Sequence, residues 1–160
     1  SRLAVVGACV DREPTMAGKP ARPLLETTCT RLGCHRPIFV GDRLDTDILG
    51  ARNAGITSLF VLTGAHGVHD LMDADPDRRP DHIGADLGAL LEPPQRVVVG
   101  GDAARCDGQL VRQIDGDLEV DLTNHDMAAQ LSGVRALLEL VWTGRVPVNH
   151  DALSVFDLLH

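Results

Sequence analysis

Short apolar runs alternate with helix-like segments between residues 21 and 91, and this alternation constrains the fold more than any other feature of the sequence. Residues 37–40 form one such run and residues 58–62 a second, each with the length of a strand that is buried on both faces. A shorter run lies near residues 82–84. Strands that alternate with helices at this spacing are typical of a parallel sheet covered by helices. We therefore predict an α/β fold for this part of the chain.

Glycine follows each of the two helices that we expect around the first strand. Apolar residues recur at three- and four-residue spacing over residues 24–32, and Gly33 comes next. A second helix covers residues 48–54 and is followed by Gly55. Glycine is favoured just after a helix because it adopts the left-handed backbone conformation without a steric penalty. A brief third helix is expected over residues 86–91.

The hydrophobic pattern of the chain changes after two consecutive prolines, Pro93 and Pro94. These prolines remove two backbone donors and oppose helix continuation. Beyond them, the apolar spacing changes to the alternation typical of antiparallel strands. We therefore expect two units. Residues 1–92 form the α/β unit, and residues 96–160 form a small α+β module.

The module is predicted to contain a hairpin and two helices. Residues 110–114 and 118–122 alternate apolar and polar side chains on either side of Asp115-Gly116, a tight-turn pair. The first helix has an apolar stripe formed by Met127, Leu131, Val134, Leu138 and Val141. The second is expected to start at Asp151, a good N-cap, and to bury Leu153, Phe156 and Leu159.

Charge and cysteine content exclude several classes of protein. The chain has 23 acidic and 15 basic residues, a formal charge of −8, which opposes binding to nucleic acid or to an anionic membrane. It contains no apolar run near the roughly 20 residues that span a bilayer, and we expect no signal peptide. The four cysteines, Cys9, Cys29, Cys34 and Cys106, have no CxxC spacing. These features predict a cytoplasmic protein with reduced thiols.

Three carboxylates, Asp42, Asp45 and Asp47, follow the first strand within six residues. Ligands of open parallel sheets bind beyond the carboxyl ends of the strands, which is where these acids are expected. Like charges at close range need compensation, and Mg²⁺ supplies it because it binds carboxylate oxygens while keeping water and phosphate ligands. Gly41 lets the chain turn at the strand tip, so Asp42 is the first choice of metal ligand.

Each of these acids also has a purely structural interpretation. Asp42 after a glycine is compatible with an ordinary turn. Asp45 or Thr46 can cap the helix that follows, or Asp45 can lie in solvent. Asp47, in the first turn of that helix, is favoured by the helix dipole. The residues alone leave these alternatives open.

Lys19 is the only lysine among the 15 basic residues, and it lies between Gly18 and Pro20 just before a helix. An ammonium group on a flexible stem is a good point charge for a phosphate oxygen or an aspartyl phosphate. Most single lysines are merely solvated, which is the alternative here. The position of the lone lysine favours a functional role.

Four ordered motifs together resemble the haloacid dehalogenase superfamily of phosphatases: residues 18–20 (Gly-Lys-Pro), 40–48 (Val-Gly-Asp-Arg-Leu-Asp-Thr-Asp-Ile), 53–55 (Asn-Ala-Gly) and 61–64 (Val-Leu-Thr-Gly). The resemblance is to the branch that contains p-nitrophenyl-phosphatase, phosphoglycolate and glycerol-3-phosphate phosphatases, and it covers residues 18 to about 91. Residues 96–160 are similar in size and position to the C-terminal extension of actinobacterial glycerol-3-phosphate phosphatases. The fold implied is the C-terminal half of a doubly wound parallel, Rossmann-like core with a small α+β module.

The resemblance implies a Mg²⁺-dependent hydrolase of small phosphorylated metabolites. Lys19 would hold the transferring phosphoryl group, Asp42 would bind Mg²⁺, and Asp47 would support the metal shell and its waters. In the family, a nucleophilic aspartate attacks phosphorus to form an aspartyl phosphate, which water then hydrolyses.

The sequence departs from the family at its N-terminal side. The nucleophile motif Asp-x-Asp-Gly and the cap domain that should precede the lysine are not found in this chain. We therefore expect the C-terminal portion of a longer phosphatase, inactive on its own. The strand at residues 37–40 would then expose an apolar edge, which the N-terminal half or another chain, including a second copy in a homodimer, would cover.

Other patterns indicate different chemistry less strongly. His66 and His69 have a spacing that can place two metal ligands on one helical side, but Gly67 lies between them without a third ligand, which favours a surface loop. Cys106 beside Arg105 is expected to be a buried hairpin thiol. No Gly-x-Ser-x-Gly elbow of a serine hydrolase occurs. The alternative function is a non-catalytic regulatory or assembly module that keeps the fold and the metal motif.

Overall fold

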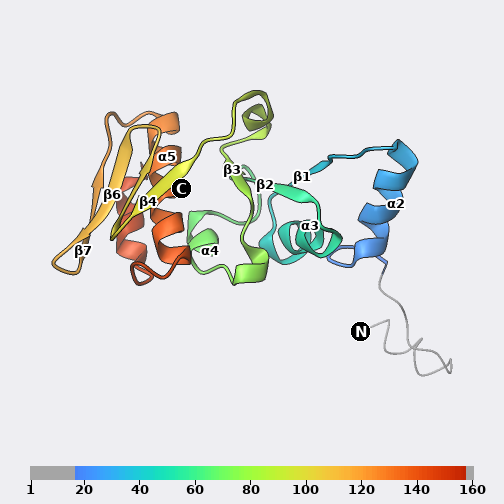
Figure 1. The fold of residues 1–160 in the computed structure, drawn as a ribbon, viewed down its shortest axis with the longest axis horizontal. Helices are drawn as coiled ribbons and strands as arrows, with labels where there is room; N and C mark the ends of the chain where they lie inside the picture. The colour runs from blue at the N-terminus through green and yellow to red at the C-terminus, as the bar shows by residue number, and fades with distance from the viewer. Residues whose placement is uncertain (1–16, 158–160) are drawn as a thin grey trace, which may run out of the picture.

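The computed structural model describes residues 17–157, which form two β-sheets of different kinds. The expectations for Cys9 and Leu159 lie outside these residues. Figure 1 shows an antiparallel sheet and a long helix at one end of the molecule, a parallel sheet in the middle and the first described helix at the opposite end.

The parallel sheet contains, in this order, β1 (Ile38–Gly41), β2 (Thr57–Val61) and β3 (His82–Gly84). Leu59 in the central strand lies opposite Val40 on one side and opposite His82 on the other. The strands begin and end within one residue of their predicted positions. The α/β fold predicted from the alternation of apolar runs is confirmed.

Strand β1 is less buried than the sequence predicts. Ile38 is 50% exposed and the other β1 residues are half-buried, whereas β2 is buried from Ser58 to Val61. The reason is that, among the described residues, β2 has a neighbour on both sides while β1 pairs only with β2. The expectation of a strand buried on both faces is therefore wrong for residues 37–40, and the expected apolar edge is present.

Helical segments connect the strands: α2 (Arg22–Leu32), the π-helix η1 (Leu44–Ile48), α3 (Leu49–Ala54), α4 (Val68–Met72), and the 3₁₀ helices η2 (Pro76–Arg78) and η3 (Leu87–Leu91). Gly33 and Gly55 have φ angles of 61° and 66° at the ends of α2 and α3, as predicted. The apolar face predicted for residues 24–32 is mostly exposed, since α2 packs mainly on α3 and buries only Leu25.

The antiparallel sheet contains four strands in chain order: β4 (Val97–Gly100), β5 (Ala103–Cys106), β6 (Gln109–Ile114) and β7 (Asp117–Asp121). Asp115 and Gly116 have φ angles of 53° and 96° and form the turn of the predicted β6–β7 hairpin. The sequence does not predict β4 and β5. The first lacks apolar–polar alternation, and the second contains alanine and arginine, which favour strands weakly.

Helix α5 (Met127–Trp142) covers the inner face of the antiparallel sheet. Its stripe from Leu131 to Val141 is buried as predicted, while Met127 in the first turn is 40% exposed. Cys106 is buried in the hydrophobic core, as expected for a hairpin thiol.

The last described element is the 3₁₀ helix η4 (His150–Val155), which leads into the buried Phe156. Its Leu153 is buried as predicted. The expected N-cap at Asp151 is wrong, because the side chain of Asn149 accepts the hydrogen bond from the Asp151 backbone N–H. The helix therefore starts one residue earlier than predicted.

One hydrophobic cluster extends from the parallel sheet into the antiparallel sheet and α5. The sheet type changes at residues 92–96, where we place the boundary between residues 1–92 and 96–160, and this division stays a prediction. Trp142 Nε1 in α5 donates a hydrogen bond to the carbonyl of Leu71, 3.0 Å away, which ties the two units together. No helix within residues 17–157 combines the length and the apolar character needed to cross a bilayer.

Candidate functional site

The carboxyl end of β1 leads directly into the acidic segment. Asp42 follows the strand, and η1 starts two residues later, so the chain turns sharply out of the sheet at Gly41. A Cβ on Gly41 would lie 2.6 Å from Asp47 Cγ, which leaves no room for a side chain. Glycine at this position therefore lets the Asp47 carboxylate pack against the strand tip.

The loop after β2 holds Asp42 in place. The backbone N–H of Ala65 donates to Asp42 Oδ2 over 2.7 Å, and the backbone N–H of His66 donates to the Asp42 carbonyl over 3.1 Å. Gly64 lies so close to the Asp42 carboxylate that any Cβ at this position would overlap it. Asp42 Oδ1 accepts no hydrogen bond from the described residues, so one carboxylate oxygen stays available.

Asp47 connects the acidic segment to Lys19. Lys19 Nζ lies 2.6 Å from Asp47 Oδ1, and the Arg43 backbone N–H donates to Asp47 Oδ2 over 3.3 Å. The Asp47 side chain is 6% exposed and that of Lys19 is 40% exposed. Lys19 also lies over the ring of Phe39, 5.7 Å from its centroid. A buried carboxylate thus fixes an ammonium group on a side chain that is still partly exposed.

Asp45 belongs to a different environment. Its carboxylate forms a two-point ion pair with the Arg43 guanidinium at 2.9 and 3.1 Å, and its side chain is 43% exposed. The hydrogen bonds from Arg43 lower the pKa of Asp45, so the carboxyl stays ionised at neutral pH. Neither Asp45 nor Thr46 caps η1, whose N-cap position is Arg43 and has no side-chain hydrogen bond. The capping alternative for these two residues is therefore wrong.

The donor set fits a Mg²⁺ ion that takes one protein carboxylate. Asp42 has an oxygen without a hydrogen bond from the described residues, and its carboxylate packs closely against Gly64. In Asp47, by contrast, one oxygen accepts a hydrogen bond from Lys19 and the other from Arg43. Among residues 17–157, no three His, Cys, Asp or Glu side chains converge on a common point. Mg²⁺ commonly binds one or two protein carboxylates and completes its shell with water and phosphate, so this sparse set is sufficient.

The two histidines that the sequence singles out as possible metal ligands lie in different surroundings. His66 receives the Leu44 backbone N–H on its Nδ1. The ring of His69 packs edge-on against His150, with 5.3 Å between centroids. His66 lies in the loop before α4, as expected, whereas the loop expectation is wrong for His69, which lies within α4.

Sequence reasoning misses the residues that hold Asp42. Gly64 and Ala65 act through their backbone, and neither belongs to a residue type that signals metal binding. His66 is singled out by the sequence only as a possible metal ligand, whereas here its backbone N–H and its ring acceptor contact the acidic loop. The Thr-Gly pair after β2 gives a weak signal, because a glycine at a strand end often marks a close backbone approach.

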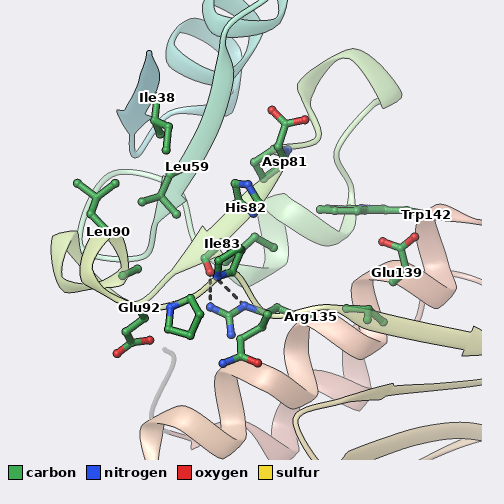
Figure 2. Close-up of a pocket in the computed structure, with 16 residues that line it drawn as sticks. Ile38, Leu59, Asp81, His82, Ile83, Leu90, Glu92, Arg135, Glu139 and Trp142 are labelled. Atoms are coloured by element: carbon green, nitrogen blue, oxygen red, sulfur yellow. Dashed lines mark hydrogen bonds between the residues drawn. The ribbon is translucent and has the colours of Figure 1, made fainter. Parts of the chain in front are cut away.

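A cavity among the described residues lies elsewhere. It has a volume of about 330 Å³ and opens between η3, residues 92–95 and α5, as Figure 2 shows. Its lining includes Ile38 and His82, the first residues of β1 and β3, so it lies toward the amino ends of these strands. Arg135 borders it and donates two hydrogen bonds to the Ile83 carbonyl. The candidate site at the carboxyl ends is therefore separate from this cavity.

Comparison with known proteins gives consistent matches. Residues 16–90 match a family model described as HAD-hydrolase-like. The chain is 37% identical over 161 residues to the D-glycerol 3-phosphate phosphatase of Mycobacterium tuberculosis, covering 94% of this chain and 43% of that protein. It is 36% identical over 97 residues to phosphoglycolate phosphatase 2 of Arabidopsis thaliana, covering 58% of this chain and 32% of that protein.

A solved structure also matches the whole chain. The crystal structure of a glycerol phosphate phosphatase from M. tuberculosis in complex with magnesium is 32% identical and gives a TM-score of 0.64. The match covers 99% of this chain and 48% of that chain, so it includes the antiparallel module. In each of these three comparisons, the chain spans less than half the length of the relative.

Proposed function

We propose that the chain is part of a Mg²⁺-dependent phosphatase of small organic phosphates, because residues 16–90 match the family model of haloacid dehalogenase-like hydrolases. The observation that carries the proposal is the arrangement at the carboxyl end of β1. Asp42, which keeps an unshared oxygen, and Asp47, which holds the Lys19 ammonium group, both lie within six residues after β1. A phosphate monoester needs such a pair, a metal and a fixed cation, to neutralise its charge.

Each residue has a distinct task in the proposed reaction. Asp42 binds the metal through Oδ1, because its Oδ2 is occupied by the Ala65 N–H. Lys19 binds a phosphoryl oxygen with the protons that Asp47 leaves free. Asp47 keeps Lys19 in place and stays outside direct metal contact, since both of its oxygens already accept hydrogen bonds. Bound Mg²⁺ would neutralise charge on the transferring phosphoryl group.

The nucleophile is proposed to come from sequence outside these 160 residues. Both M. tuberculosis matches span less than half of the relative, which leaves room for an aspartate that forms an aspartyl phosphate and for a domain that selects the substrate. The substrate class, a small phosphate monoester, is supported by the names of the relatives, which are phosphatases of glycerol phosphate and phosphoglycolate.

The proposal is tested by phosphate release from p-nitrophenyl phosphate. A protein that carries these residues together with the sequence encoded upstream of Ser1 should hydrolyse it with Mg²⁺ and stop when the metal is chelated. Lys19→Ala should reduce kcat/KM by about 100-fold or more, because a charged contact to the transferring group is lost. The 160-residue chain should be inactive. Turnover by this chain alone would contradict the placement of the nucleophile.

The alternative of a non-catalytic module makes a different prediction. If the chain only regulates or assembles, the longer protein should release no phosphate from any monoester, with or without Mg²⁺. The names of the relatives, which are phosphatases, favour the enzyme.

A further inference from the structure

His66 bridges two points of the acidic loop. Its backbone N–H donates to the Asp42 carbonyl over 3.1 Å, and its ring Nδ1 accepts the backbone N–H of Leu44 over 3.0 Å. The ring is half-buried beside the loop. A single residue of the β2–α4 connection therefore contacts the chain just before and just after Arg43.

The ring contact satisfies a group that would otherwise lack a partner. Leu44 is the first residue of η1, and the first N–H groups of a helix have no acceptor within the helix. No side chain caps η1 from its N-cap position. The His66 ring, which belongs to the loop after β2, accepts the Leu44 N–H instead. The π-helix that carries Asp47 is thus anchored to the β2 side of the site.

The same contact determines what His66 can do. A ring nitrogen that accepts a backbone N–H carries no proton, so the proton of the neutral ring is on Nε2. Nδ1 is used by Leu44, and Nε2 has no lone pair to offer a metal in this tautomer. His66 therefore acts on the site through hydrogen bonds and not as a ligand.

We propose that His66 is a positioning residue for metal binding, one that fixes the loop from Asp42 to Leu44 so that the Asp42 carboxylate is held in its binding orientation. The inference rests on the proposed function, because it assigns Asp42 to the metal. Groups that orient a metal ligand are commonly worth 10- to 100-fold in metal affinity. The hydrogen-bond acceptor on the His66 ring, rather than the charge or the size of the ring, is expected to raise the Mg²⁺ affinity.

Two substitutions separate the acceptor from the rest of the side chain. In His66→Asn, Oδ1 stands as many bonds from Cα as the histidine Nδ1, so it can accept the Leu44 N–H. In His66→Gln, the oxygen is one bond farther away and matches Nε2 instead. His69→Gln is the control, because the His69 ring in α4 packs against the ring of His150 in η4 rather than serving as the acceptor for Leu44.

The experiment measures Mg²⁺ binding by calorimetry in the longer protein, together with kcat and KM for p-nitrophenyl phosphate. We expect His66→Gln to weaken Mg²⁺ binding by about 10-fold or more, His66→Asn to stay within about 3-fold of the wild type, and His69→Gln to be unchanged. Thermal melting of each variant checks folding. Equal Mg²⁺ affinity in the wild type and His66→Gln, or an equal loss in His66→Asn and His66→Gln, would overturn the inference.

Failure of the proposed function gives a different result. If Asp42 does not bind the metal, Asp42→Asn leaves the Mg²⁺ affinity at the wild-type value. If Asp42→Asn abolishes binding while the His66 variants do not affect it, the function stands and only the positioning role is lost.

Discussion

At the scale of single residues, three aspartates within six positions have three different environments. Asp42 keeps an unshared oxygen, Asp45 is paired with Arg43 at the surface, and Asp47 is buried against Lys19. The sequence identifies all three as candidates but cannot rank them with certainty, because their partners come from other segments. Lys19 lies 28 positions before Asp47, and Ala65 lies 23 positions after Asp42.

The close approach of Gly64 to Asp42 gives a first prediction. Gly64→Ala should displace the Asp42 carboxylate, since a Cβ at this position would overlap it, and should lower Mg²⁺ affinity by about 10-fold or more. Gly67→Ala in the same loop is the control, because no atom lies within 4 Å of its Cβ position and its φ is −124°. Calorimetric Mg²⁺ titration compares the two. Equal affinities would show that Asp42 is free to move.

The Lys19–Asp47 pair gives a prediction that separates stability from activity. Lys19→Met leaves the buried Asp47 carboxylate without its cation and should lower the free energy of unfolding by about 1–3 kcal/mol. The double variant Lys19→Met/Asp47→Asn removes the charge as well and should recover most of that stability while staying inactive. Urea denaturation and p-nitrophenyl phosphate hydrolysis measure the two quantities. Recovery of activity in the double variant would contradict the phosphate-binding role of Lys19.

At the scale of elements, the hydrophobic pattern predicts where strands and turns lie along the chain. It does not predict how deeply their side chains are buried, because burial depends on the neighbouring elements. The three parallel strands and the β6–β7 hairpin follow from apolar runs and turn residues, and they are found where expected. The exposure of Ile38 and the weak burial of α2 do not follow from pattern, because a residue's burial depends on the elements beside it. The same holds for η4, whose cap at Asn149 lies two positions before the expected one.

The exposed edge of β1 predicts self-association of the 160-residue chain. An apolar strand with unpaired backbone groups is a template for pairing, and Ile38 on this strand is 50% exposed. Ile38→Glu should reduce the concentration-dependent increase in mass measured by sedimentation. Leu91→Glu removes a 91% exposed apolar side chain outside any strand and should change it little. A stable monomer of 17.1 kDa at all concentrations would argue against an open edge.

At the scale of the whole molecule, the antiparallel module is fastened to the parallel sheet through α5. Arg135 Nε and Nη2 both donate to the Ile83 carbonyl in β3, and burial lowers the pKa of this guanidinium. Arg79 contributes from the other side, with its Nη1 bonded to the Trp142 carbonyl at 2.9 Å. These contacts join segments about 50 to 60 positions apart, which no local pattern reveals.

Removal of the Arg135 contact should loosen this attachment. Arg135→Met keeps the aliphatic length but leaves the Ile83 carbonyl without its two donors, and should lower the free energy of unfolding by about 1–3 kcal/mol. Arg105→Met on the exposed side of β5 is the matched control and should have little effect. Chemical denaturation compares them, and an equal change in both variants would contradict a specific role for Arg135.

In the proposed site, Asp42 binds the metal and its neighbour Asp45 does not. The most direct measurement is kcat/KM for p-nitrophenyl phosphate in the longer protein with saturating Mg²⁺, compared between Asp42→Asn and Asp45→Asn. Both substitutions remove one negative charge from the same loop. We expect a loss of about 100-fold or more for Asp42→Asn and wild-type activity within about 3-fold for Asp45→Asn, whose side chain contacts Arg43 at the surface. Equal activity in the two variants, at any level, would contradict this expectation.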